Sequence, residues 1–256
     1  MKKILSMLLV LCMALTLCSA AFAEGKSPVD GMTVAFIPKV SGNSFFEAAN
    51  DGAQKYAADW GLTVDYIGAP TADVTTQLEL IQQAIDKGVD AICISSVDAT
   101  GLDEKLQEAQ DAGIYVSTWD SDVSPNARAL MVSQGTADVL GPMLVDMAVE
   151  SLKERGVDVN GEVKYVWHFS NPSVSDQNSW YVAGDEYIKE KYPSWVAVHD
   201  PYYSNQDPAQ SVSVGESILD AYADVDVIIC NDSTALPGQC KAAENKGLTA
   251  KDITIT

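Results

Sequence analysis

From residue 32 onward, the chain alternates short apolar stretches with longer stretches whose apolar residues recur at helical spacing. Glycines close the first three helical stretches, at Gly61, Gly88 and Gly113. This first round predicts strands at 32–37, 62–67, 89–95 and 114–119, with a helix after each of the first three. Strands that alternate with helices across short loops favour a parallel sheet with right-handed crossovers.

The alternation breaks after Asp122 and then begins again. Residues 125–128 are expected to form a loop, 129–132 a short extended piece, and 134–136 the passage from one lobe to the next. The second round predicts helices at 137–155, 176–190, 210–222 and 235–245, and strands at 162–169, 195–200, 225–230 and 253–256. Pro142 is expected in or beside the first turn of its helix, where few N–H donors are needed. The sequence therefore predicts two successive α/β lobes, 24–133 and 134–256.

The N-terminus has the pattern of a secretion signal. Lys2 and Lys3 precede an apolar run, and Ala21-Phe22-Ala23 matches the small residues that signal peptidase reads, so residues 1–23 are predicted to be removed. Leu17 stands before Cys18 where a bacterial lipoprotein signal carries Gly or Ala, which argues against a lipid anchor. We therefore expect an exported protein, in the periplasm or on the outer face of the cell membrane.

Composition narrows the classes of partner. The chain has 36 acidic residues against 16 Lys and Arg residues, which gives a net charge of −20. This argues against a nucleic-acid partner, because binding to the phosphate backbone requires Lys and Arg side chains. Outside the signal, Cys93 and Cys230 lie in apolar runs, where they are expected to be small buried hydrophobes, and Cys240 stands alone. His168 and His199 are far apart and lie in no metal motif. No metal and no cofactor are predicted.

An enzyme is the rival class. Asp120 and Asp176 are two carboxylates that a glycosidase would need as acid and base. The sequence carries none of the hydrolase, metalloprotease, phosphate-loop or dinucleotide motifs that would accompany catalysis. A sugar-responsive transcriptional regulator would need a basic helix-turn-helix where this chain has its secretion signal. The prediction is a binding protein and not an enzyme.

The stretch after the fourth predicted strand is the first candidate for a site. It ends in Trp119, Asp120, Ser121 and Asp122, and ligands of open α/β sheets bind outside the carboxyl ends of the strands. A carboxylate such as Asp120 accepts hydrogen bonds from hydroxyls and donates none. The site chemistry therefore suits a sugar-like polyol.

Several short segments, taken together and in order, resemble the type I periplasmic sugar-binding proteins of ABC transporters. Within that family the resemblance is to the members that bind the quorum-sensing signal autoinducer-2, with the rhamnose-binding members next. The segments that carry it are Ile37-Pro38-Lys39, Gly42-Asn43 with Phe45-Phe46, Thr118 to Asp122, Gln134-Gly135-Thr136, Met143 to Ala148, Ser175 to Trp180, and Ala235-Leu236-Pro237. The resemblance implies two Rossmann-like lobes with a ligand cleft between them.

The resemblance also implies a site. Lys39, Asp120, Asp176 and Gln177 match the positions whose side chains contact the hydroxylated furanose. Two further contacts fall at Asn231 and Ser233, where the family has Pro and Ala, so a different hydroxylated ligand is a second prediction. Phe45 and Phe46 offer ring faces to a sugar or belong to the core, and for Trp119 and Trp180 the core is the favoured interpretation.

By the same resemblance, the expected function is capture of autoinducer-2 or a similar furanose by closure of the two lobes. Rhamnose or another pentose or hexose is the alternative ligand. A membrane permease, and in some members a chemoreceptor, would read the closed form of a monomer. The chain stops at Thr256 inside a predicted strand, so the C-terminal lobe is expected to be incomplete; a natural terminus on an edge strand is the alternative.

Overall fold

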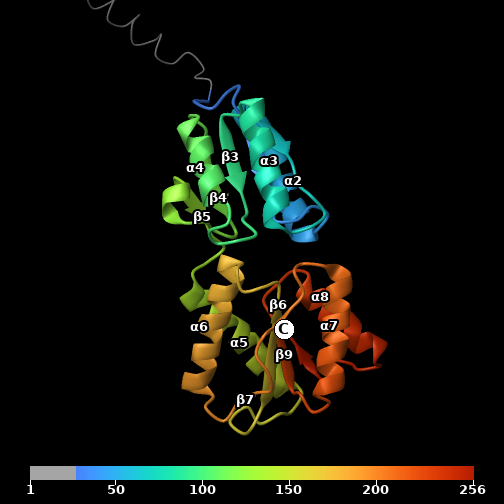
Figure 1. Ribbon diagram of the computed structural model, residues 1–256. Helices are drawn as coiled ribbons and strands as arrows, with labels where there is room; N and C mark the ends of the chain where they lie inside the picture. The colour runs from blue at the N-terminus through green and yellow to red at the C-terminus, as the bar shows by residue number, and fades with distance from the viewer. Residues whose placement is uncertain (1–26) are drawn as a thin grey trace, which may run out of the picture.

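The computed structural model describes residues 27–256, which form two α/β lobes, one above the other in Figure 1. The predicted signal peptide at 1–23 and Cys18 lie outside the described residues. Each lobe has its own five-stranded parallel sheet, with strand orders β2-β1-β3-β4-β5 and β10-β9-β6-β7, where β8 pairs with β6. The fold class predicted from the alternation of strands and helices is confirmed.

The first sheet buries both faces under helices. Its strands are β1 Thr33–Ile37, β2 Thr63–Tyr66, β3 Ala91–Ile94, β4 Tyr115–Trp119 and β5 Leu130–Val132. Alternate residues of β1 point to opposite faces, as the strand period of two requires. Ala35 and Ile37 pack with α3 (Val74–Lys87) and α4 (Asp103–Asp111), whereas Phe36 packs with α2 (Ser44–Trp60) on the other face.

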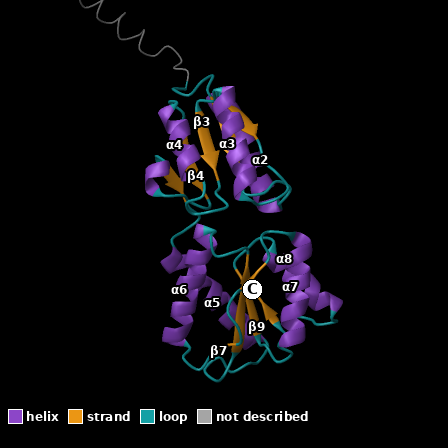
Figure 2. Cartoon of the chain, in the orientation of Figure 1, coloured by secondary structure: helices purple, strands orange, loops and turns teal. Residues whose placement is uncertain are grey.

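The second sheet repeats this arrangement. Its strands are β6 Lys164–Phe169, β7 Val196–Ala197, β8 Tyr202–Tyr203, β9 Val227–Cys230 and β10 Thr254–Ile255. Trp167 and Phe169 face α5 (Ala137–Glu154) and α6 (Ser175–Lys191), while Val166 faces α7 (Pro208–Ala221) and α8 (Ala235–Asn245). Figure 2 shows the two helix pairs on opposite sides of the strands.

Local signals set the helix ends. Asn43, Asp73 and Asp207 cap α2, α3 and α7 by accepting a hydrogen bond from a backbone N–H in the first turn. Gly61 and Gly88 end α2 and α3 in the left-handed conformation, at φ +73° and +68°, as predicted. The ends matter for function because several site residues stand just before a helix or in its first turn.

Three details of the sequence prediction were wrong. The strand expected at 195–200 is only two residues long, and a separate short strand, β8, follows it. Residues 125–127 form a 3-10 turn rather than an irregular loop. Pro142 is the sixth residue of α5 and therefore lies in the second turn, so it removes one intrahelical hydrogen bond instead of falling where none is made.

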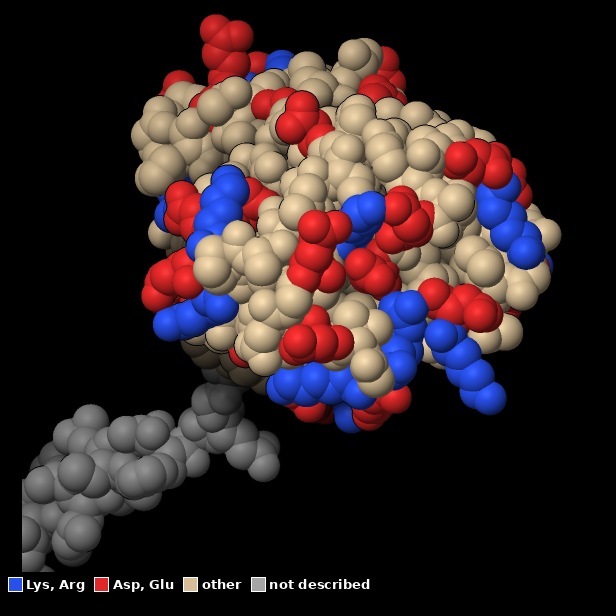
Figure 3. All heavy atoms as spheres, turned by 90° about the horizontal axis from the view of Figure 1, so that it is seen from below, with Lys and Arg blue, Asp and Glu red and all other residues tan. Residues whose placement is uncertain are grey.

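The surface does not concentrate charge of one sign on the face drawn in Figure 3, where acidic and basic side chains are interspersed. Across the part of the chain that the structure describes, no helix combines the length and the apolar character needed to span a bilayer. Of the three cysteines in residues 27–256, all free, Cys230 is buried as predicted, Cys93 is half-buried and Cys240 is exposed.

Candidate ligand-binding site

The site lies where the strand order of each sheet reverses. In the first sheet β1 and β3 are neighbours, and in the second β6 and β9 are neighbours, although neither pair is consecutive in the chain. At such a point the connecting helices leave on opposite faces and open a crevice at the carboxyl ends of the strands. Lys39 follows β1, Asp176 and Gln177 follow β6, and Asn231 follows β9. These residues from both lobes line one cavity.

Lys39 is the centre of the charge cluster. Its side chain is 2% exposed, and Nζ lies 3.0 Å from Oδ2 of Asp120 and 3.2 Å from each carboxylate oxygen of Asp176. Burial alone would lower the pKa of Lys39, but Asp176 and Asp120 outweigh it and raise the pKa above its usual value. Because Asp120 belongs to the first lobe and Asp176 to the second, this ammonium joins the lobes.

Asp120 is held by a strained backbone. Its φ is +61°, a conformation that residues other than glycine rarely adopt. The side chain accepts a hydrogen bond from Ser95 Oγ at 2.6 Å and another from the amide of Gln134. Burial raises the pKa of Asp120, Lys39 opposes that shift and Asp176 adds to it, so the net direction is upward. The carboxylate is therefore oriented before any ligand arrives.

Asp176 and Gln177 stand in the first turn of α6, where backbone N–H groups favour a negative charge. Ser121 of the first lobe donates a hydrogen bond to Asp176. The Gln177 amide spans two segments: Oε1 accepts from the Ser170 N–H at 3.0 Å, and Nε2 donates to Asp232 Oδ2 at 2.6 Å. Each Gln177 group keeps further hydrogen-bonding capacity for a ligand.

The loop after β9 contributes three polar residues with different roles. Asn231 is buried, and its Nδ2 donates to the backbone carbonyl of Gln177 at 2.6 Å. Asp232 accepts from the N–H groups of Thr234 and Ala235, at 2.9 and 2.7 Å, and so binds the start of α8. Burial raises the pKa of Asp232, although those amides favour the carboxylate. Ser233 is exposed and meets Asn43 of the first lobe, whose Nδ2 lies 3.1 Å from its Oγ.

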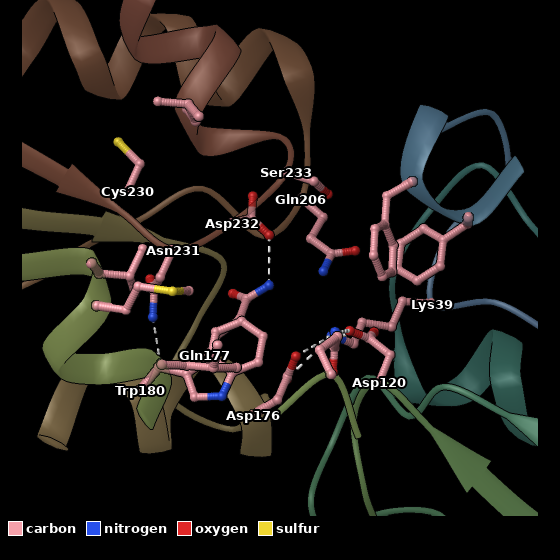
Figure 4. Close-up of a pocket in the computed structure, with 17 residues that line it drawn as sticks. Lys39, Asp120, Asp176, Gln177, Trp180, Gln206, Cys230, Asn231, Asp232 and Ser233 are labelled. Carbon is pink, nitrogen blue, oxygen red and sulfur yellow. Dashed lines mark hydrogen bonds and ion pairs between the residues drawn. The ribbon is translucent and has the colours of Figure 1, made fainter. Parts of the chain in front are cut away.

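These residues surround one cavity of about 330 Å³, a volume within the range of small-molecule sites (Figure 4). The apolar part of the lining comes from both lobes: α2 supplies Phe45 and Phe46, and α5, α6 and α8 supply Leu140, Met143, Leu144, Trp180 and Leu236. Phe46 is buried and also packs edge-on against Trp119, with ring centroids 5.7 Å apart. Trp119 stacks on Phe36 in the core and does not line this cavity. A lining that combines polar groups with apolar and aromatic side chains suits a ring that carries hydroxyls.

All eight residues singled out from the sequence line this cavity. They are Lys39, Phe45, Phe46, Asp120, Asp176, Gln177, Asn231 and Ser233. Sequence reasoning missed Asp232, Gln206 and Gln134. Asp232 could have been predicted from the sequence, because it follows a predicted strand and lies between Asn231 and Ser233, which were both named as site residues. Gln206 could not, because the short strand before it was not predicted. No group of three or more acidic, His or Cys residues within 27–256 forms a metal site.

The chain belongs to the periplasmic binding protein family, since the family model for the periplasmic binding protein domain matches residues 34–256. Among solved structures it is similar to LsrB from Clostridium saccharobutylicum in complex with AI-2. The identity is 59% and the TM-score 0.87, over 88% of this chain and 69% of that one.

Two other relatives are more distant. A solute-binding protein from Clostridium phytofermentas with bound L-rhamnose has the same fold, with a TM-score of 0.80 and 24% identity over 88% of this chain and 67% of that one. The D-ribose/D-allose-binding protein of Pseudomonas aeruginosa is 28% identical over 49% of this chain. That match spans 41% of the relative's length.

Proposed function

We propose that this protein is the extracytoplasmic binding component of an ABC importer and that it captures AI-2 (autoinducer-2) in the cavity between its lobes. The observation that carries the proposal is the buried Lys39, Asp120 and Asp176 cluster, which draws on both lobes and opens into the cavity. Its support from relatives is the 59% identity to a protein solved with AI-2.

The charge balance of the cavity favours a neutral polyol. Three carboxylates, those of Asp120, Asp176 and Asp232, surround the single ammonium of Lys39. Carboxylates accept hydrogen bonds from vicinal hydroxyls, each worth roughly 1.5 to 3 kcal/mol where one partner is charged. A phosphate or carboxylate on the ligand would meet like charge instead. The ligand is therefore a hydroxylated, uncharged ring of monosaccharide size.

The ligand stabilises the closed form of the two lobes, because its contacts come from both. Lys39 and Asp120 come from the first lobe, and Asp176 and Gln177 come from the second, so a ligand that touches all four binds best when the lobes are together. Binding then shifts the population toward closure, because the ligand's affinity for the closed form is greater. We assign the lobes to 24–133 and 134–256, with the crossing at 134–136.

A rhamnose-like sugar is the second candidate ligand. Asn231 and Ser233 are the observation in its favour, because they place polar groups where the autoinducer-2 binders have Pro and Ala. Asn231 Nδ2 donates to the Gln177 carbonyl, whereas its Oδ1 is buried without a donor among the described residues. We rank AI-2 first because of the 59% identity to a protein solved with AI-2.

The remaining assignments follow from the family. The protein acts outside the cytoplasm after removal of residues 1–23, and the closed monomer delivers its ligand to a membrane permease. A chemoreceptor is a second protein that recognises the closed, ligand-bound form. Ligand is bound and released without chemical change, so the protein is not an enzyme.

Calorimetry of the protein with AI-2, rhamnose, ribose and xylose tests the proposal. We expect AI-2 to bind at micromolar or better affinity, about −8 kcal/mol or stronger, and to be recovered unchanged by chromatography. A sugar that binds at least about tenfold tighter than AI-2 would replace it as the ligand, since that ratio is about 1.4 kcal/mol of preference. Turnover of the ligand would contradict the binding-protein function itself.

The Asp176→Asn variant tests the site. It removes the charge that Lys39 and Ser121 contact, and we expect AI-2 affinity to fall about tenfold or more, as for loss of a charged hydrogen-bond partner. Glu190→Gln is the matched control, because it makes the same charge change at an exposed position of α6. Unchanged affinity in Asp176→Asn would remove Asp176 from the site.

A further inference from the structure

The short loop between β8 and α7 carries a buried amide that has no protein partner. Gln206 is 4% exposed, and its Oε1 is buried without a hydrogen-bond donor among the residues that the structure describes. Asn231 Oδ1 in the same cavity also lacks a donor, but the Asn231 Nδ2 is paired, as are Lys39, Asp120 and Gln177. A buried carbonyl oxygen without a donor is destabilising and therefore calls for a physical explanation.

The backbone of this loop is strained as well. Asn205 and Gln206 have φ values of +50° and +56°, and neither is a glycine. Hydrogen bonds to β6 and the residue after it fix this conformation: Ser204 N donates to the Phe169 carbonyl at 3.0 Å, and Asn205 N donates to the Ser170 carbonyl at 2.9 Å. Strain of this kind persists where the surroundings hold it, and it is concentrated at binding sites.

The strain places the Gln206 side chain in the ligand cavity. Figure 4 shows Gln206 projecting between Asp232 and Ser233 on one side and Lys39 on the other. Gln206 and Ser233 also line a second cavity of about 350 Å³ beside the first. Gln206 therefore lies between the two cavities.

We propose that Gln206 is a ligand-contacting, specificity-determining residue, whose amide oxygen accepts a hydrogen bond from a ligand hydroxyl. The inference rests on the proposed function, because it takes the cavity to be a polyol site. A hydroxyl at this end of the ligand satisfies the unpaired oxygen, whereas a ligand with hydrogen or a methyl group there leaves it unpaired. Gln206 thus selects for hydroxylation at the end of the ring that faces the second cavity.

A matched pair of glycine variants tests the proposal. Gln206→Gly and Asn205→Gly relieve backbone strain at adjacent residues, but only the first removes a side chain that lines the cavity, since Asn205 is exposed. We expect Gln206→Gly to weaken AI-2 binding about tenfold, the effect of one lost hydrogen bond, and Asn205→Gly to change it less than about twofold. Gln206→Leu keeps the bulk of the side chain without its polar atoms, and the same loss is expected.

Thermal melts without ligand separate binding from folding. Neither Gln206 variant loses a protein hydrogen bond, so both are expected to melt at or above the wild-type temperature while binding more weakly. Wild-type affinity in Gln206→Leu would overturn the inference and leave the proposed function intact. Failure of the wild-type protein to bind AI-2, rhamnose, ribose or xylose would overturn both.

Discussion

Buried polar side chains decide what this protein can bind and how its stability responds to pH. In the cleft, Lys39 balances Asp120 and Asp176, so removing Lys39 would leave two buried carboxylates without a counter-charge. Burial raises the pKa of Asp120 and of Asp232, and Lys39 and hydrogen bonds from neighbouring groups oppose that shift. Ligand hydroxyls add to those hydrogen bonds.

His168 gives a prediction about pH. It is fully buried on β6, Nδ1 lies 3.2 Å from Gln239 Oε1, and burial lowers its pKa to about 4 against the opposing effect of Gln239. Between pH 6.5 and 4 the unfolded chain binds a proton at this residue that the folded chain does not, so stability falls as the pH falls through that window. The full loss from this residue is on the order of 3 kcal/mol.

Chemical denaturation of wild type and His168→Gln between pH 7 and 4 measures this effect. The variant keeps a polar group near Gln239 without an ionisable ring, and its unfolding free energy is expected to depend less on pH. His199→Gln is the control, because His199 is exposed and is the only other histidine. Equal pH dependence in wild type and His168→Gln would show that His168 does not titrate in this way.

At the level of helices and strands, close packing of α5 on α6 positions half of the site. Gly141 of α5 and Gly184 of α6 meet at the crossing, where a Cβ on Gly141 would lie 2.6 Å from the Gly184 nitrogen and 2.7 Å from the Trp180 carbonyl oxygen. Because α6 carries Asp176 and Gln177 in its first turn, the crossing sets how far those side chains reach toward the first lobe. Part of the apolar lining depends on it too, through Leu140 and Trp180.

Gly141→Ala is therefore expected to destabilise the protein. The added methyl group would clash with backbone atoms, which cannot move away as a flexible side chain could. We therefore expect a loss of about 1 to 3 kcal/mol in unfolding free energy. Gly52→Ala is the matched control: Gly52 lies in helix α2, a Cβ there meets nothing within 4 Å, and a gain of about 0.5 to 1 kcal/mol is expected. If both variants are equally stable, the crossing is not tightly packed.

For the molecule as a whole, several hydrogen bonds join the two lobes. Besides the Lys39 pairs, the Ala99 N–H donates to the Ser173 carbonyl at 3.0 Å and the Asp122 N–H to Ser175 Oγ at 3.0 Å. On the other side of the cleft, Asn43 Nδ2 lies 3.1 Å from both Ser233 Oγ and Thr234 Oγ1. The start of α2 therefore lies against the start of α8.

Asn43→Ser tests whether that contact stabilises closure. Serine caps a helix about as well as asparagine, so α2 keeps its N-cap, but the shorter side chain cannot reach the second lobe. We expect an unchanged melt without ligand, about threefold to tenfold weaker AI-2 binding, and a larger average radius in small-angle scattering. Asp73→Ser changes the cap of α3 in the same way without a contact between lobes. If Asn43→Ser scatters and binds like wild type, the contact contributes nothing to closure.

The sequence alone determined most of the elements and eight of the residues that line the cavity. Helix spacing and the glycines at 61 and 88 are local signals, so the order of strands and helices in both lobes could be predicted from them. Residues such as Asp120 follow their strands directly, and the sheet then brings strand ends together whatever the details of packing. That is why eight chosen side chains, four of them matched through family resemblance as direct ligand contacts, lie around one cavity.

Only the tertiary structure decided what those side chains contact. Asn231 directs its amide to the Gln177 carbonyl, 54 residues away in the chain, and Gln206 reaches the cavity because its loop hydrogen-bonds to Ser170. Strand β8 is two residues long and forms by pairing with β6, so the sequence contains no periodic pattern from which it could be predicted. Periodicity reports which face a residue takes within its own element, whereas these contacts join segments that meet only after both faces of the sheet are packed.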